Sequence, residues 1–252
     1  MLFIPISKLC SIPDVDQESM MNNSNKNKKL IIIGEGETAT IAYEYFTHDS
    51  PYKVVAFSVE REFINKPELF GLPIVPFEDL DIFYNPEDYY AFVAISYTQL
   101  NRVRTRLYLE TKAKGFSFAN YISSRAFVWH NVEIGENCFI FENNVIQPFV
   151  KIGNNVILWS GNHIGHRTVI KDNCYISSHV VISGFCEIGK SSFLGVNCSF
   201  ADQIKVADDC LIGMGAVVIK DTEPQKIYTG NPAKPNEKVS SLRYFKVKEN
   251  AS

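Results

Sequence analysis

The chain has 252 residues, which allows one large or two small domains. Its formal net charge is only −3, so the composition gives no sign of the basic surface that binds nucleic acid or an anionic membrane. No apolar run reaches the length of a transmembrane helix, and residues 1–6 are too short and lack the basic start of a secretory signal. We therefore expect a cytoplasmic protein with neither nucleic-acid nor membrane partners.

Residues 1–28 end in a polar run and show no periodicity, so they are predicted to form a flexible tail. A short apolar run at residues 30–33 then predicts a buried strand. Directly after it comes the turn GEGETA, residues 34–39, and residues 41–46 carry apolar side chains at helical spacing. The order is therefore strand, glycine turn and helix.

In this order, a G-x-G-x-x-A turn is typical of nucleotide binding. The glycines allow close approach, and N–H groups at the start of the helix can face a phosphate. A complete NAD domain also needs a second half and an acidic residue after its second strand, for which Glu60 is the only candidate. We expect Gly34, Gly36, Glu37 and Glu60 to form a site for one nucleotide with its diphosphate. The alternatives are an NAD site and a turn that only shapes the fold.

Further elements complete this N-terminal unit. Two apolar runs, residues 54–57 and 91–95, predict strands, and residues 100–114 predict a helix that Gly115 ends. Residues 29–118 are therefore predicted to be an α/β domain of about half a dinucleotide-binding (Rossmann) fold.

From Ile122 to Val218 every sixth residue is aliphatic or aromatic. In a chain that is 46% apolar, such a run has chance odds on the order of 10⁻⁶, so it is an internal repeat. Six is a multiple of the strand period of two and fits no helical period. This is the hexapeptide pattern of a parallel β-helix, and it resembles the left-handed form, in which three short strands make one coil of eighteen residues.

The period also predicts how the coil packs. We expect each sixth residue to point into a narrow prism and to stack on the residue eighteen positions away, with small residues after it at tight corners. The coil domain is predicted to cover residues 119–235, with no long loop protruding between Ile122 and Val218. An ordinary all-β domain is the alternative.

Five of the six cysteines occupy the position two before an apolar stop of the repeat. We interpret them as small buried side chains, reduced in a reducing compartment, and not as disulfide or metal sites. They are Cys138, Cys174, Cys186, Cys198 and Cys210.

The chain has five histidines, and two of them, His163 and His166, lie within residues 159–167. The phase of the repeat places both outside the prism. Imidazole titrates near neutral pH and is the usual general base there. Zinc held by three imidazoles is the alternative, but the histidine spacing does not reproduce the pattern of the hexapeptide metal hydratases, so no metal is expected.

After the coil comes GNPAK, residues 230–234, and then residues 236–252, which are predicted to form a basic helical tail. A glycine turn in an α/β unit, a hexapeptide coil with an outward histidine, and this Gly-x-Pro-Ala-Lys run together resemble the bacterial nucleotide-sugar acyltransferases. These include enzymes that acetylate 4-amino sugars and the related sialic-acid O-acetyltransferases. The resemblance implies a homotrimer, acetyl-CoA in a groove between neighbouring coils, and a nucleotide sugar held by the N-terminal unit.

The same resemblance implies roles for single residues. His166 would be the general base, with His163 or Asn162 orienting it, and backbone amides near Gly184 would stabilise the oxyanion. The residues at the cofactor groove would be Tyr175, Gly184, Val196 and Met214. Two positions depart from the family, because Arg167 stands where an acidic residue often follows the histidine and Tyr175 stands where a second histidine is common.

The predicted activity is direct acyl transfer, most simply acetyl transfer from acetyl-CoA to the amino group of a nucleotide-linked sugar. An O-acetyltransferase of the same fold and a non-catalytic trimeric nucleotide-binding scaffold are the alternatives.

Overall fold

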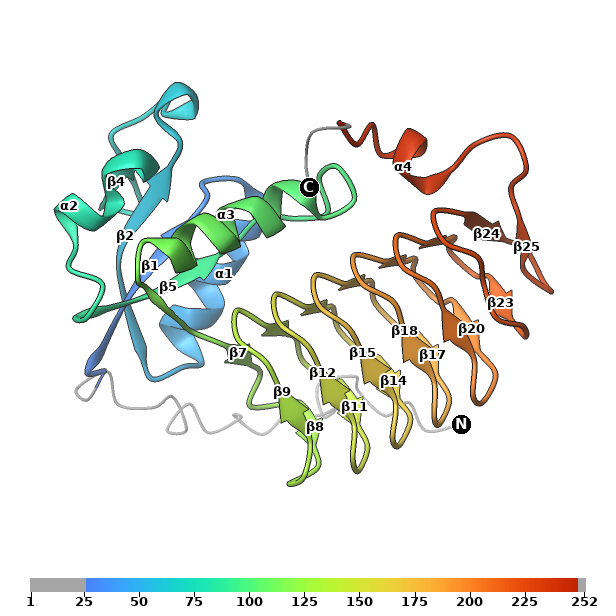
Figure 1. Ribbon diagram of the computed structural model, residues 1–252. Helices are drawn as coiled ribbons and strands as arrows, with labels where there is room; N and C mark the ends of the chain where they lie inside the picture. The colour runs from blue at the N-terminus through green and yellow to red at the C-terminus, as the bar shows by residue number, and fades with distance from the viewer. Residues whose placement is uncertain (1–25, 249–252) are drawn as a thin grey trace, which may run out of the picture.

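The computed structural model describes residues 26–248. The predicted N-terminal tail therefore lies, except for its last three residues, outside the described residues. Two parts follow each other along the chain: an α/β unit and a long prism of stacked coils (Figure 1).

A six-stranded sheet with the order β3-β4-β2-β1-β5-β6 forms the centre of the α/β unit. All neighbours run parallel except β3 and β4. In chain order the elements are β1 Lys28–Ile33, α1 Glu37–His48, β2 Tyr52–Val59, β3 Glu68–Leu69, β4 Leu72–Pro76, α2 Leu80–Phe83, β5 Tyr89–Val93, α3 Arg102–Ala113 and β6 Ser117–Phe118, with short 3₁₀ turns at Arg61–Phe63 and Phe77–Asp79. The sequence did not reveal β3, β4 and α2, because Pro73 and Pro76 interrupt β4 and the other two elements are very short.

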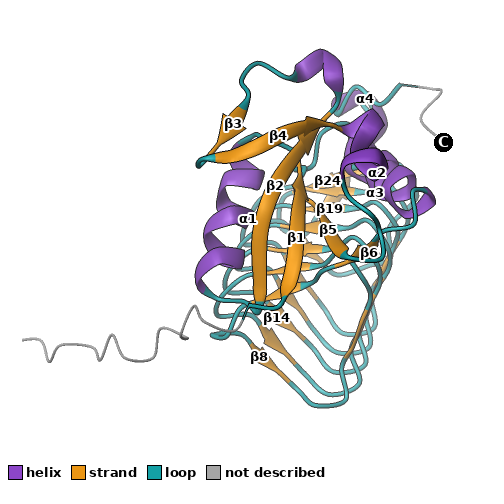
Figure 2. Ribbon diagram, turned by 90° about the vertical axis from the view of Figure 1, so that its left-hand side faces the viewer, coloured by secondary structure: helices purple, strands orange, loops and turns teal. Residues whose placement is uncertain are grey.

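The two long helices cover opposite faces of this sheet (Figure 2). Helix α1 packs Ala39, Ala42 and Phe46 on one face, in the same apolar cluster as Leu30 and Phe92. Helix α3 contributes to the cluster on the other face. Every residue of the run at 30–33 is thus buried, as expected for a parallel strand covered on both sides.

Seventeen two-residue strands, β7 to β23, form the prism, and each pairs in parallel with the strands one coil before and after it, except at the ends of the sheets, where only one neighbour exists. The first sheet contains β7 Tyr121–Ile122, β10 Phe139–Ile140, β13 Ile157–Leu158, β16 Tyr175–Ile176, β19 Phe193–Leu194 and β22 Leu211–Ile212, extended by β24 Ile227–Thr229 and β25 Lys234–Pro235. The second contains β8 Phe127–Val128, β11 Val145–Ile146, β14 His163–Ile164, β17 Val181–Ile182, β20 Ser199–Phe200 and β23 Val217–Val218. The third contains β9 Glu133–Ile134, β12 Lys151–Ile152, β15 Val169–Ile170, β18 Glu187–Ile188 and β21 Lys205–Val206.

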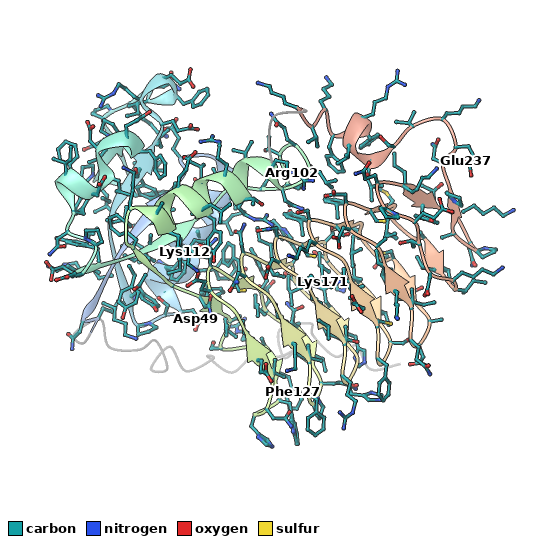
Figure 3. The ribbon with its side chains drawn as sticks, viewed as in Figure 1. Asp49, Arg102, Lys112, Phe127, Lys171 and Glu237 are labelled. Carbon is teal, nitrogen blue, oxygen red and sulfur yellow. The ribbon has the colours of Figure 1, made fainter. Side chains whose placement is uncertain are left out.

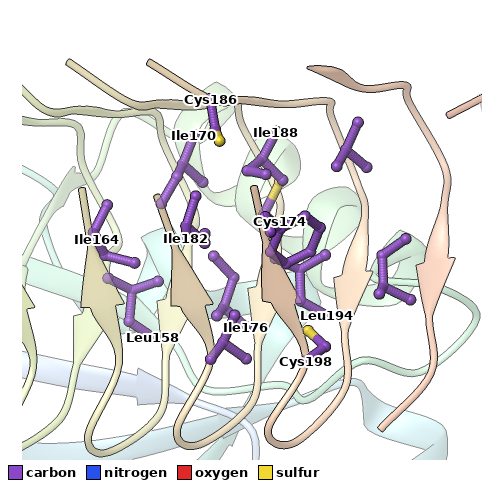
Figure 4. Packing of buried hydrophobic residues seen from close by; sticks show 14 of the residues in the cluster. Leu158, Ile164, Ile170, Cys174, Ile176, Ile182, Cys186, Ile188, Leu194 and Cys198 are labelled. Atoms are coloured by element: carbon purple, nitrogen blue, oxygen red, sulfur yellow. The ribbon is translucent and has the colours of Figure 1, made fainter. Parts of the chain in front are cut away.

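The predicted inward stacking is present along nearly the whole prism (Figure 4). Ile140, Ile164 and Ile188 are fully buried in one continuous apolar cluster, and the five repeat cysteines fill the gaps between such residues with at most 1% exposure. The first coil is the exception: Val128 and Ile134 are only partly buried there, and Ile122 is 39% exposed. No preceding coil covers these residues.

The three outer faces of the prism differ in chemistry. The first sheet presents the aromatic face, formed by Tyr121, Phe139, Ile157, Tyr175 and Phe193, which is covered by the α/β unit. The second sheet presents the apolar face, whose exposed members are Phe127, Val145 and Val181 with the corner residues Trp129, Phe149 and Phe185. The third sheet presents a charged face, on which Lys151 pairs with Glu133 at 3.0 Å.

Polar contacts fix the α/β unit on the aromatic face, at points marked in Figure 3. Arg102 pairs with Asp209 at 2.7 Å, Lys112 pairs with Glu136, and the Tyr121 hydroxyl donates to Asp49 at 2.8 Å. These contacts span both ends of helix α3 and the end of helix α1. They therefore hold the α/β unit against the coil.

The C-terminal segment folds back over the last coils. Helix α4 covers only Ser241–Tyr244, with Ser240 as its N-cap. Phe245 then packs on Phe193 and Tyr97, at ring-centroid distances of 5.5 and 6.0 Å. Residues 249–252 of the predicted helical tail lie outside the described residues.

Candidate active site

His166 lies on the corner that joins β14 to β15, and its side chain is exposed. Its backbone N–H donates to Oε1 of Gln147 at 2.9 Å, and Nδ1 of its ring lies 3.4 Å from the same oxygen. Because a backbone N–H can only donate, it fixes which end of the Gln147 amide faces His166. That oxygen can only accept, so the geometry favours the tautomer with a proton on Nδ1 and a free lone pair on Nε2.

The ring of His166 packs over the corner of the next coil. A Cβ atom built on Gly184 would lie 2.6 Å from Cε1 of the ring and 3.0 Å from both ring nitrogens, so only glycine leaves this space open. The ring of Phe185 meets the imidazole edge-on, with centroids 5.0 Å apart. Gln147, Gly184 and Phe185 together define where the imidazole lies.

Arg167 and Asn162 do not face this imidazole. The guanidinium of Arg167 lies over the ring of Phe149, 4.5 Å from its centroid, on the preceding coil. Asn162 is 1% exposed, and its side chain accepts from the backbone N–H of Val180 at 2.7 Å while donating to the Trp159 carbonyl. Asn162 therefore links two coils, and we assign it no role in the reaction proposed below.

His163 lies on the apolar face, half-buried on strand β14. Its neighbours in the sheet are Val145 on one side and Val181 on the other. Since His166 lies at the corner that follows the same strand, both predicted histidines border this face.

The predicted cofactor residues occupy two edges of the apolar face, with one exception. Gly184 lies beside His166 on one edge, whereas Val196 and Met214 precede β20 and β23 on the other edge and are 42% and 81% exposed. Tyr175 is the exception and a correction to the prediction. It lies on the aromatic face, stacked on Phe193 with centroids 5.3 Å apart, and this burial raises its pKa to about 12.

The backbone amide of Gly184 is not free. It donates to Oδ1 of Asp202 at 2.9 Å, and the next amide, that of Phe185, donates to the His166 carbonyl at 2.9 Å. The amides of Gly184 and Phe185 are therefore not free to stabilise an oxyanion in this structure, and the expectation of oxyanion donors near Gly184 stays a prediction.

Thiols and metals do not form an alternative centre in the part of the chain that is described. Burial raises the pKa of Cys174 and of Cys198 to about 12, so both are protonated at neutral pH and poor nucleophiles. No group of three or more His, Cys, Asp or Glu side chains within residues 26–248 could hold a metal ion.

A second site lies in the α/β unit, where a cavity of about 260 Å³ opens at the carboxyl ends of β1, β2 and β5. Gly34, Gly36 and Glu60 line it together, as the glycine turn predicts. Gly34 has φ +122°, and a Cβ atom there would lie 2.9 Å from the Ala94 carbonyl, so the fold itself requires this glycine. A Cβ atom on Gly36 would meet nothing within 4 Å, which leaves its backbone open to a ligand.

The two acidic residues that were predicted for this site differ in position. Glu60 pairs with Arg106 at 3.0 Å, whereas Glu37, the exposed first residue of α1, does not line the cavity. Glu35 and Ser58 line it without having been predicted, and Oε2 of Glu35 and Oγ of Ser58 are buried with no hydrogen-bond partner among residues 26–248. The sequence could not reveal Ser58, because nothing distinguishes it from other small residues of a buried strand.

None of the helices within residues 26–248 has the length and hydrophobicity needed to cross a membrane.

Comparisons with known proteins show which proteins share this fold. The family model described as bacterial transferase hexapeptide (six repeats) matches residues 131–166 and 149–184. Among solved structures, the acetyltransferase domain of PglB from Neisseria gonorrhoeae is 26% identical, with a TM-score of 0.73 over 83% of this chain and 100% of that one. PerB from Caulobacter crescentus, solved with CoA and GDP-perosamine, is 25% identical, with a TM-score of 0.73 over 82% of this chain and 97% of that one.

WeeI from Acinetobacter baumannii shares the fold, with 20% identity and a TM-score of 0.63 over 83% of this chain and all of that one. A comparison with curated proteins gave no significant match. The predicted fold class, an α/β unit followed by a left-handed parallel β-helix, is confirmed. The predicted resemblance to the nucleotide-sugar acyltransferases is confirmed as well: this chain is an acyltransferase with hexapeptide repeats, and it is similar in fold and sequence to enzymes of that kind.

Proposed function

We propose that the protein transfers an acetyl group from acetyl-CoA to the amino group of a nucleotide-linked sugar, with His166 as the general base. The observation that carries this proposal is the setting of the imidazole. It is exposed at the edge of an apolar face, it packs over a glycine that leaves room for it, and Gln147 favours the tautomer with a free Nε2.

The reaction requires two proton transfers, and the imidazole of His166 carries out both. As the sugar amine attacks the thioester carbon, Nε2 of His166 takes a proton from the nitrogen, and the carbon–sulfur bond breaks. The imidazolium then returns a proton to the departing sulfur. A cysteine nucleophile is not required, which agrees with the raised pKa values of the buried thiols.

The apolar face supports a homotrimer with acetyl-CoA between its coils. Six large apolar side chains of this face are between 36% and 52% exposed, and a second copy of the chain would bury them. In a closed ring, one edge of the face on one copy meets the other edge on the next copy. His166 and Gly184 of one chain would then face Val196 and Met214 of its neighbour across the groove that takes the acyl donor.

The α/β unit is the proposed site of the acceptor. Its cavity is separate from the apolar face, and the open backbone at Gly36 lies at its edge, next to the start of helix α1. PerB, with CoA and GDP-perosamine bound, supports a nucleotide-linked amino sugar as the acceptor class. Transfer to a sugar hydroxyl would use the same base and the same donor groove.

Purified protein mixed with acetyl-CoA and a panel of nucleotide-linked amino sugars tests this function. We expect thiol release that depends on one of the sugars, and a product that keeps its acetyl group in alkaline hydroxylamine, as an amide does and an ester does not. A product that loses the group would make the protein an O-acetyltransferase. Binding of nucleotide sugar without any thiol release would favour the non-catalytic scaffold.

A further inference from the structure

We infer that the cavity of the α/β unit takes a guanine base and that the carboxylate of Glu35 selects it. The inference rests on the proposed function, because it names the nucleotide of the acceptor. It starts from the two polar atoms in the cavity that lack partners, Oε2 of Glu35 and Oγ of Ser58.

These two atoms indicate a polar ligand. Ser58 is 0% exposed, and the backbone around it is already paired, since its carbonyl accepts from the N–H of Gly34 at 2.8 Å. Leaving a buried hydroxyl and a buried carboxylate oxygen unpaired costs free energy, and a bound ligand that supplies their partners removes that cost. Because Ser58 is fully buried, only a group that enters the cavity can reach its hydroxyl.

The walls of the cavity fit a flat ring and not a diphosphate. Apolar side chains make up much of the lining: Val59, Phe63, Ile95, Val103 and Leu107. No Lys or Arg of residues 26–248 lines the cavity, whereas the carboxylate of Glu35 does and would repel a phosphate. At about 260 Å³ it is also smaller than sites that enclose a whole drug-sized ligand, which span roughly 300–1,000 Å³. The base therefore enters, and the diphosphate stays outside.

The chemistry of a carboxylate distinguishes between bases. An ionised carboxylate can only accept hydrogen bonds, and its two oxygens pair best with two parallel donors. Guanine offers two, N1–H and the 2-amino group, on one edge. Uracil, cytosine and adenine place a carbonyl oxygen or a ring nitrogen lone pair beside their single donor, which repels the second carboxylate oxygen. The hydroxyl of Ser58 can in addition donate to a carbonyl oxygen, and guanine carries one next to N1–H.

Calorimetric titration of the full chain with nucleoside diphosphates, without acetyl-CoA, tests the inference. We expect GDP to bind more tightly than UDP, CDP and ADP. IDP, which lacks only the 2-amino group, should bind about 10- to 100-fold more weakly than GDP, as expected for a lost hydrogen bond to a charged group. The IDP comparison needs no variant, so it stands even if a substitution disturbs folding.

A matched pair of variants locates the effect. Glu35→Gln should weaken the binding of GDP by a similar factor and leave the binding of UDP unchanged. Glu44→Gln removes an exposed carboxylate from helix α1 and should change the affinity for neither nucleotide. Equal affinity for GDP and UDP would overturn the inference. An equal loss of affinity for all four nucleoside diphosphates in Glu35→Gln would overturn it too and would place the carboxylate on the ribose. Either result would leave the proposed function intact. Binding of no nucleotide at all would overturn the nucleotide-sugar function itself.

Discussion

The imidazole of His166 lies directly against the α-carbon of Gly184 in the next coil, so that a methyl group on Gly184 would come within 2.6 Å of Cε1. Gly184→Ala should therefore push the ring away from its position while the coil stays folded, because the nearest atoms are those of a movable side chain. We expect kcat to fall about 10²-fold, the lower end of what a general base supplies, with little change in melting temperature.

Gly189→Ala is the matched control. A Cβ atom there would lie 2.4 Å from the backbone of Ala207 and would not approach His166. It should lower the melting temperature without a specific loss of kcat. If both variants lose stability and activity in parallel, the glycine at 184 serves the coil alone.

Gln147 should act through His166 as a positioning residue, since its Oε1 lies 3.4 Å from Nδ1 of the ring. Gln147→Leu removes the acceptor and should lower kcat about 10-fold with unchanged KM for acetyl-CoA. Gln147→Glu places a negative charge at the same point, which favours the imidazolium and raises the pKa of the base. In a plot of kcat against pH, the acid limb of Gln147→Glu should therefore lie at higher pH than that of the unchanged protein. An unshifted limb in Gln147→Glu would show that this side chain does not communicate with the base.

The apolar face should be the contact between protomers. Val181→Asp puts a charge into that contact from a side chain that is 45% exposed in one chain. We expect light scattering to show a monomer with less than about 1% of the activity, because a shared donor groove is lost. Val169→Asp on the charged face is the control and should remain a trimer. A trimer in both variants would place the contact elsewhere.

Arg104 should be a main determinant of stability at the junction of the two parts. Its guanidinium is 0% exposed and donates to the carbonyls of Asn155, Asn173 and Cys174 at 3.1–3.2 Å, and burial lowers its pKa to about 10. Arg104→Leu should cost about 3–5 kcal/mol in urea unfolding, because three buried carbonyls lose their donor. Arg106→Leu, on the same helix but 44% exposed, should cost less than about 1 kcal/mol. Equal costs would mean that α3 is held by its apolar side chains alone.

The period of six was enough to predict the coil, because an inward side chain at every sixth residue follows directly from strand geometry. Tight corners explain only in part why small residues follow the inward positions. Gly135 and Gly153 do not have positive φ; a Cβ atom on either would lie within 2.8 Å of the next coil's backbone. The left-handed corner residues come two positions later, for example Asn137 and Asn155, with φ 54° and 57°.

The sequence also contains a pattern with a period of eighteen. The residue before each inward position is mostly aromatic in the first sheet, as at Phe139 and Phe193, apolar in the second, as at Val145, and charged in the third, as at Lys151. This pattern distinguishes the covered face, the exposed apolar face and the solvent face. It would have placed Tyr175 under the α/β unit and away from the cofactor groove. The unpaired polar atoms in the cavity of the α/β unit could not be found in this way, because they depend on the packing of three strands and a helix.

The measurement that tests the account most directly is the steady-state kinetics of His166→Asn beside His163→Asn, once an acceptor is known. Removing the base should lower kcat about 10²- to 10⁴-fold while the trimer and the affinity for acetyl-CoA are retained, and His163→Asn should be much milder. A His166→Asn variant with full kcat would contradict the proposed site, and a large loss in His163→Asn alone would assign the base to His163.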